Sequence, residues 1–273
     1  MLKTRVLTAL VLLPLAWLLV FRATPEVFML IAAALLLIGS WEFHRLAALP
    51  GLAGAGALLA VQAALFAALL ACWPQWTANP MPPFQLACLA WLLLFAQLWL
   101  YQPGRAPDRV YRIRSFLSAI GVITFGWMAI AWLRAEPLGQ WWILSLLLII
   151  FAADIGAYFC GRAWGQRKLA PAISPGKTLA GLYGGLACSA LTGAALALCL
   201  PQLQAGPLTL ATLAVVTALV SAGGDLFISM HKRSVGLKDC GAIFPGHGGV
   251  LDRFDSLLAG APFFALGKLL AGL

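Results

Sequence analysis

The sequence predicts an all-α protein, a polytopic integral membrane helix bundle with eight or nine transmembrane helices. Three observations predict this class: the composition, the lengths of the uncharged stretches and the placement of the basic residues. The chain of 273 residues is 62% hydrophobic and only 10% charged, whereas a soluble domain is about 25% charged. Since a folded chain of this size still exposes roughly a quarter of its unfolded surface, an ordinary soluble enzyme is excluded and the expected solvent is a lipid bilayer.

The uncharged stretches set the expected number of helices. These stretches are residues 6–21, 27–41, 46–104, 115–133, 137–153, 178–224 and 256–267. A crossing needs about 20 residues, so 46–104 and 178–224 are each long enough for two spans. Their Pro-containing breaks at 72–84 and 201–207 are typical of turns. We therefore expect eight spans and a ninth, with a shorter apolar run, that begins near residue 251.

The basic residues predict the orientation in the membrane. With the N-terminus in the cytosol, only three of the 18 Lys and Arg residues fall outside: Arg22, Arg134 and Lys268. This asymmetry follows the positive-inside rule, so the net charge of +9 is an orientation signal and not evidence for nucleic-acid binding. We expect the first span to stay uncleaved, because no small-x-small cleavage site follows Phe21.

Acidic side chains are scarce, and their placement is informative. Of the nine Asp and Glu residues, five lie in the C-terminal half on expected cytosolic-side segments: Asp154, Asp225, Asp239, Asp252 and Asp255. Carboxylates within spans, such as those of Asp154 and Asp225, usually face a cavity, an ion or a substrate; the alternative is a structural ion pair with Lys or Arg. We expect one membrane domain, in which residues 1–138 form scaffold spans and residues 139–273, with two cytosolic motif segments, carry the function.

The last cytosolic segment, residues 232–256, interleaves bases with carboxylates. A helix that starts after Gly249 would place Asp252 and Asp255 on one face, and Asp225 would arrive at the same depth from another helix. Carboxylate oxygens arranged in this way suit Mg²⁺. The bases of the segment are Lys232, Arg233, Lys238 and Arg253. They would repel one another unless phosphates lay between them; the alternative is that they only mark the cytosolic face.

The same segment contains the string PGHGG at residues 245–249. Its glycines, Gly248 among them, allow main-chain N–H groups to approach an anion closely. We expect His247 to donate to phosphate, and the alternative is a loop histidine in solvent.

A second cytosolic loop, residues 161–181, contains the string GKT at 176–178. It is not a P-loop, because Pro171 stands where that motif needs Gly. We expect a turn bearing Ser174 and Lys177 that opens the next helix, whose N-terminal amides attract phosphate. The alternative is a connecting loop with orientation charges.

Two segments resemble the motifs of a known family. Residues 229–255, SMHKRSVGLKDCGAIFPGHGGVLDRFD, resemble the signature of the phosphatidate cytidylyltransferases, also called CDP-diacylglycerol synthases. Residues 154–185, DIGAYFCGRAWGQRKLAPAISPGKTLAGLYGG, are similar to the second motif of that family. The chain departs from the pattern at Ala180, Ile228 and His231, and none of these departures removes a charged core residue.

The resemblance implies a multi-span fold and transfer of CMP from CTP to phosphatidate, which gives CDP-diacylglycerol and pyrophosphate with Mg²⁺ as cofactor. The residues expected to be catalytic are Asp225, Lys238, Asp252, Arg253 and Asp255. The three aspartates among them are the expected metal ligands. The residues expected to bind substrate are Ser174, Lys177, Lys232, Arg233, His247 and Gly248.

The expected partners are CTP, phosphatidate and membrane lipids, without nucleic acid and with a homodimer left open. The expected location is the cell membrane, the inner membrane of a bacterium, with the site on the cytosolic side. Three other classes remain as alternatives. A CTP-dependent lipid-alcohol kinase would need a base for a neutral hydroxyl group. A CDP-alcohol phosphotransferase should show its own spaced Asp and Gly motif, which is not found, and an anion transporter should carry its charges near mid-bilayer.

Overall fold

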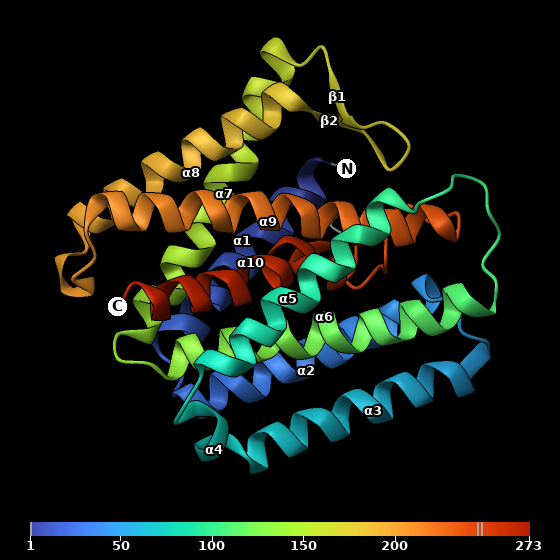
Figure 1. Ribbon diagram of the computed structural model, residues 1–273, viewed down its shortest axis with the longest axis horizontal. Coiled ribbons are helices and arrows are strands. Elements are labelled where there is room, and N and C mark those ends of the chain that lie inside the picture. Colours follow the sequence, from blue (N-terminus) through green and yellow to red (C-terminus); the bar gives the residue numbers. More distant parts are fainter. Residues whose placement is uncertain (1, 245, 247) are drawn as a thin grey trace.

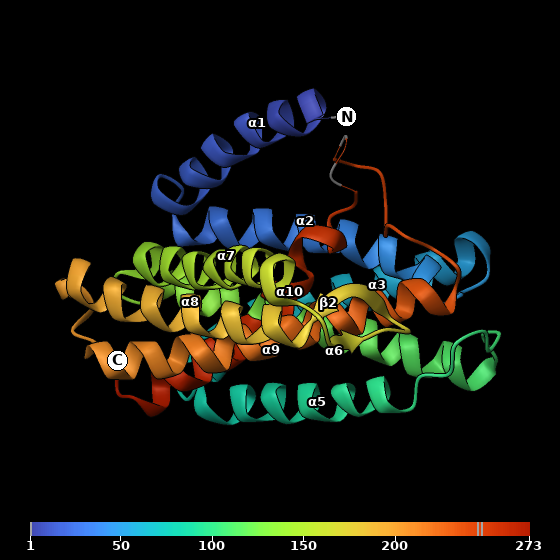
Figure 2. The same ribbon diagram turned by 90° about the horizontal axis from the view of Figure 1, so that it is seen from above.

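The computed structural model describes residues 2–244, 246 and 248–273, with the side chains of residues 2–9 left aside. Its long helices are α1 (Leu2–Phe21), α2 (Pro25–Leu46), α3 (Gly51–Ala71), α5 (Met81–Trp99), α6 (Arg109–Ala135), α7 (Gly139–Trp164), α8 (Leu179–Cys199), α9 (Pro207–Ser234) and α10 (Leu251–Leu270). These helices lie side by side in one bundle, with α1 on one side and α5 on the other (Figures 1 and 2).

Both predicted breaks are confirmed. The short helix α4 (Trp73–Thr77) separates α3 from α5, and the 3₁₀ turn η1 (Pro201–Leu203) separates α8 from α9. Proline lies in the first turn of α4, η1 and α9, where its missing N–H costs no hydrogen bond. Each long uncharged stretch therefore folds into two antiparallel helices.

The membrane class is confirmed, whereas the predicted number of eight or nine crossings stays a prediction. Seven helices among the described residues are long and apolar enough to cross a bilayer: α2, α3, α5, α6, α7, α8 and α9. Of the 20-residue helix α1, only the apolar part Leu10–Phe21 has described side chains. Crossings by α1 and α10 remain predictions.

Helix α6 forms the centre of the bundle and packs against α2, α3, α5, α7 and α10. Its polar side chains are paired across helices: Gln62 of α3 donates to Thr124 Oγ1 at 2.9 Å, and Gln97 of α5 donates to Ser118 Oγ at 3.1 Å. Asp108 caps its N-terminus by accepting a hydrogen bond from Tyr111 N at 2.7 Å, and this bond lowers the pKa of the Asp108 carboxyl. The two bonds from Gln62 and Gln97 each join α6 to a neighbouring helix, although the buried Oε1 atoms of these glutamines have no hydrogen-bond partner among the described residues.

One expectation for the loops is wrong. The segment between α7 and α8, expected to be a turn, folds into the two antiparallel strands β1 (Lys168–Ala170) and β2 (Ser174–Thr178). Thr178 then caps α8, because its hydroxyl accepts a hydrogen bond from Gly181 N at 3.1 Å. In Figure 1 this hairpin lies at the same end of the bundle as the C-terminal end of α9 and the start of α6. This is the arrangement that the predicted topology requires of cytosolic segments.

Candidate active site

Helices α9 and α10 approach each other closely at Gly224. A Cβ atom at this position would lie 2.5 Å from Ala259 Cβ and 2.7 Å from the carbonyl oxygen of Asp255. Only glycine fits in so small a gap. The close approach of the two helices brings the carboxylates of Asp225 and Asp255 near enough to interact electrostatically. The two helices therefore deliver carboxylates to one place, as the sequence predicted.

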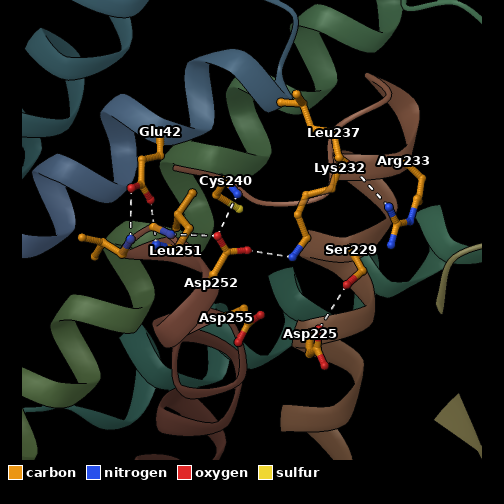
Figure 3. Close-up of polar contacts among 12 residues, drawn as sticks. Glu42, Asp225, Ser229, Lys232, Arg233, Leu237, Cys240, Leu251, Asp252 and Asp255 are labelled. Atoms are coloured by element: carbon orange, nitrogen blue, oxygen red, sulfur yellow. Dashed lines mark hydrogen bonds and ion pairs between the residues drawn. The ribbon is translucent and has the colours of Figure 1, made fainter. Parts of the chain in front are cut away.

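Asp252 lies at the start of α10 and has partners on both carboxylate oxygens (Figure 3). Its Oδ1 atom accepts from Lys232 Nζ at 2.8 Å. Its Oδ2 atom accepts from Cys240 N at 2.7 Å and from Gly249 N at 3.0 Å. The side chains of Lys232 and Asp252 are only 11% and 6% exposed, so this is a buried ion pair with backbone donors completing it.

The loop before α10 is shaped around this carboxylate. Gly248 has a φ of +81°, and a Cβ on it would lie 2.7 Å from Asp252 Oδ2. Conformation and space both demand glycine there. Burial raises the pKa of the nearby Cys240 thiol, so the group beside Asp252 is a neutral thiol.

Asp225 belongs to a second, more open ion pair. Its Oδ2 atom lies 2.7 Å from Lys177 Nζ, and the two side chains are 32% and 27% exposed. Ser229 donates to Asp225 Oδ1 at 3.1 Å, and Lys177 also donates to the carbonyl oxygen of Ala222 at 3.3 Å. Lys177 at the end of the hairpin is thereby fixed to α9, 48 residues further along the chain.

Lys232 connects the two ion pairs. It is bonded to Asp252, and it also interacts electrostatically with Asp225 and Asp255. The structural Lys–Asp pair that was the alternative for Asp225 is thus present, and a second such pair holds Asp252. In both pairs the lysine is also one of the predicted substrate-binding residues.

A cavity of about 540 Å³ lies between α7, α8, α9 and the hairpin. Its polar lining includes Asp154, Arg162 and Lys177, whereas much of the remaining wall is apolar, with residues such as Ile150 and Leu186. Because Lys177 belongs to the wall, a ligand in the cavity can reach the Lys177–Asp225 pair. The lining suits a molecule with an anionic end and an apolar end.

Other predicted site residues lie around this centre. Arg233 is exposed and donates to the carbonyl oxygens of Ile173 and Leu237 at 3.2 and 3.3 Å, so it connects α9 to the hairpin loop. Lys238 is exposed, and Ser174 is half-buried at the start of β2.

Of two further predicted site residues, Arg253 and His247, the structure describes only Arg253. Arg253 is exposed and interacts electrostatically with Asp154. His247 lies outside the described residues, so its expected contact with phosphate remains a prediction.

One contributor was missed by the sequence reasoning. The carboxylate of Glu42 on α2 accepts hydrogen bonds from Val250 N at 3.0 Å and Leu251 N at 2.9 Å (Figure 3). An acidic residue at the end of the uncharged stretch 27–41 was the signal, by the same depth argument that singled out Asp154 and Asp225.

The carboxylates match the chemistry of Mg²⁺, although no group of three or more His, Cys, Asp or Glu side chains in the described part of the chain is arranged to hold a metal ion. Mg²⁺ is usually held by only one or two carboxylates together with substrate phosphates and water. The carboxylates of Asp225, Asp252 and Asp255 each interact with Lys232 and therefore lie near one another, so one or two of them are available to such a site. The metal site itself stays a prediction.

These features define a polytopic membrane protein with an amphiphilic cavity and lysine–carboxylate pairs at one end of its bundle. Comparison with known proteins narrows the class. The sequence model of the Cytidylyltransferase family matches residues 3–270. The chain is 40% identical to a phosphatidate cytidylyltransferase of Pseudomonas aeruginosa over 265 residues, which cover 97% of this chain and 96% of the relative.

Two further relatives agree. A phosphatidate cytidylyltransferase of Haemophilus influenzae is 30% identical, with 97% of this chain and 98% of the relative aligned. One of Brucella melitensis is 44% identical over 143 residues, 52% of each chain. The chain belongs to the cytidylyltransferase family.

Proposed function

We propose that the chain is a phosphatidate cytidylyltransferase, which transfers CMP from CTP to phosphatidate and releases pyrophosphate. The observation that carries the proposal is the position of Lys177, which is paired with Asp225, in the wall of a cavity with both charged and apolar lining. A phosphorylated lipid has the same two-part character, with an anionic headgroup and apolar chains. The names of the bacterial relatives support the choice of substrates.

The reaction joins two anions, and electrostatics is the main obstacle. An oxygen of the phosphatidate phosphate attacks the α-phosphorus of CTP, and the bond from that phosphorus to the oxygen bridging to the β-phosphate breaks. Because the attacking phosphate is already ionised at neutral pH, the reaction needs no strong base. The pyrophosphate leaves with the electron pair of the broken bond, so cations must stabilise the charge that develops.

Lys177 and Lys232 are placed to supply this stabilisation. Each ammonium group holds a carboxylate at 2.7 to 2.8 Å, and each can donate to a phosphate oxygen when a substrate arrives. The carboxylates keep the lysines charged and oriented within a low-dielectric environment. Mg²⁺, held by one or two of the carboxylates of Asp225, Asp252 and Asp255 together with substrate phosphates, would neutralise phosphate charge and assist the leaving group.

The two substrates reach the site from different surroundings. A nucleotide comes from water and phosphatidate from the bilayer, so the reaction belongs at the cytosolic boundary of the membrane. With bacterial relatives as the guide, the proposed membrane is the bacterial inner membrane. A homodimer stays an open alternative, which the mass of the detergent-solubilised protein tests.

The test is incorporation of labelled CTP into lipid by the purified protein, supplied with phosphatidate and Mg²⁺. Asp252→Asn removes the charge that faces Lys232, and we expect the rate to fall by about 10²-fold or more. Glu136→Gln is the matched control, because Glu136 pairs with Lys268 at 3.0 Å in the outer half of the bundle. We expect this variant to keep wild-type activity.

Two outcomes contradict the proposal. A folded wild-type protein that forms no CDP-lipid excludes the function, and labelling of polyprenol or phytol in place of phosphatidate identifies a lipid-alcohol kinase instead. Full activity of Asp252→Asn excludes the role assigned to that carboxylate.

A further inference from the structure

We propose that Glu42 is a positioning residue, which fixes the start of α10 and so holds Asp252 in its reactive geometry. The inference rests on the proposed function and extends the site to α2, a helix that the sequence assigns to the scaffold. It is carried by the contacts that the buried Glu42 carboxylate makes with the loop and helix at residues 240–252, and by the way in which Glu42 and Asp252 share the backbone N–H donors there.

The first contact is with the N-terminus of α10. Glu42 is 3% exposed, and its two oxygens accept hydrogen bonds from Val250 N at 3.0 Å and Leu251 N at 2.9 Å. A helix normally obtains such acceptors from its own N-cap side chain, but Val250 occupies this position and has no acceptor. Glu42 therefore supplies the cap from 208 residues away, at the positive end of the helix dipole.

The second contact is with two glycines of the loop. A Cβ on either Gly241 or Gly249 would overlap the Glu42 carboxylate. Neither glycine has a positive φ, so backbone conformation does not require them. The carboxylate requires them, because the loop folds directly over it.

The third observation is that Glu42 and Asp252 accept hydrogen bonds from different backbone N–H groups of the same turn. Glu42 takes the N–H groups of Val250 and Leu251, whereas Asp252 takes that of Gly249, the residue just before them. Without Glu42 two buried N–H groups would lack an acceptor, and Asp252 would be the carboxylate nearest to them in sequence. An unsatisfied donor in such a place is costly, so Asp252 would be drawn away from Lys232.

No ion pair among the described residues includes Glu42, in contrast to Asp225 and Asp252. Backbone donors and the α10 dipole thus compensate its charge, while Lys232 remains available to Asp252. This separates the two roles: Glu42 holds the helix, and Asp252 holds the lysine.

The test compares Glu42→Gln with the Glu136→Gln control in the intact protein. The amide of Gln is nearly isosteric, but its NH₂ group would face one of the two backbone donors. We expect kcat for CDP-lipid formation to fall about 10- to 100-fold, with the KM for phosphatidate changed less than about threefold. We also expect the half-saturating Mg²⁺ concentration to rise, and neither change in Glu136→Gln.

A readout that does not depend on activity is the reactivity of Cys240. Its thiol is fully buried in the loop that Glu42 holds, so a maleimide should label it slowly in the wild type and at least tenfold faster in Glu42→Gln. Wild-type kcat together with slow labelling in Glu42→Gln would overturn the proposal. An equal loss of kcat in Glu136→Gln would also overturn it, because the effect would then be general.

A second variant keeps the test decisive if Glu42→Gln does not fold. In Gly249→Ala the new Cβ atom would overlap the Glu42 carboxylate, so Cys240 labelling should rise at least tenfold; in Gly56→Ala, where the new Cβ atom has open space, labelling should stay at the wild-type rate. Unchanged labelling in Gly249→Ala would refute the contact. If the wild type forms no CDP-lipid, the proposed function fails, yet Cys240 labelling still decides whether Glu42 holds the loop.

Discussion

Replacement of Lys177 by Met should separate catalysis from stability. The Lys177–Asp225 pair is short, at 2.7 Å, but about 30% of each side chain is open to solvent, with values of 27% and 32%. Exposed ion pairs contribute about 0.2–1 kcal/mol to folding, whereas breaking a buried pair costs about 3–5 kcal/mol. Because Asp225 also keeps its bond from Ser229, we expect Lys177→Met to lower the free energy of unfolding by only about 1 kcal/mol.

Activity should respond much more strongly. Lys177 belongs to the cavity wall, and a preorganised donor to a developing anion is worth about 10²- to 10³-fold in rate. Lys232→Met offers a matched comparison, because its pair with Asp252 is 11% and 6% exposed. That variant should lose activity and also about 3–5 kcal/mol of stability.

The assay combines CDP-lipid formation with thermal denaturation in detergent, measured on the same preparations. The expected order of stability is wild type, then Lys177→Met, then Lys232→Met, while both variants are nearly inactive. If Lys177→Met retains wild-type activity with unchanged KM values for both substrates, Lys177 does not contact either substrate. If it is as unstable as Lys232→Met, the exposure argument is wrong.

Two further predictions concern packing and topology. Gly224→Ala should place a methyl group against Ala259 Cβ and the Asp255 carbonyl, costing about 1–3 kcal/mol and separating Asp225 from Asp255; thermal denaturation and CDP-lipid formation both measure this, and unchanged values would contradict the close approach of α9 and α10. An impermeant maleimide added outside intact spheroplasts should label Cys72 and Cys199, which are exposed at the ends of α3 and α8. Labelling of both cysteines only after the membrane is broken would contradict the predicted orientation.

The fold could be predicted where it depends on the lengths of apolar stretches. Residues 115–133 predicted one helix, and α6 covers them as Arg109–Ala135. The helix is longer than the stretch because its N-terminal end continues through charged residues, which hydropathy does not recognise as helical. The hairpin could not be predicted, since strands of three and five residues, one of them containing Pro175 and Gly176, show no alternation.

The candidate site could be predicted in its residue types but not in its pairings. The start of α10 at Leu251 is where the sequence required it for Asp252 and Asp255 to share a face. The ion pair between Lys177 and Asp225, 48 residues apart, depends on how the hairpin packs against α9. This packing could not be predicted from the pattern of residue types in one sequence. The role of Glu42 was missed for a related reason. Its partners are backbone N–H groups, which every residue type except proline has, so the sequence does not indicate them.

A buried ion pair is not by itself a substrate-binding site, as the pair of Lys268 and Glu136 shows. Lys268 pairs with Glu136 at 3.0 Å, and its side chain is only 3% exposed. The rings of Trp132 and Trp142 lie 5.1 Å from its ammonium group, so aromatic faces enclose this cation. Lys177 makes an equally short contact but faces a cavity. What distinguishes the two lysines is access for a second anion, and this access is the property that a phosphate-transfer site needs.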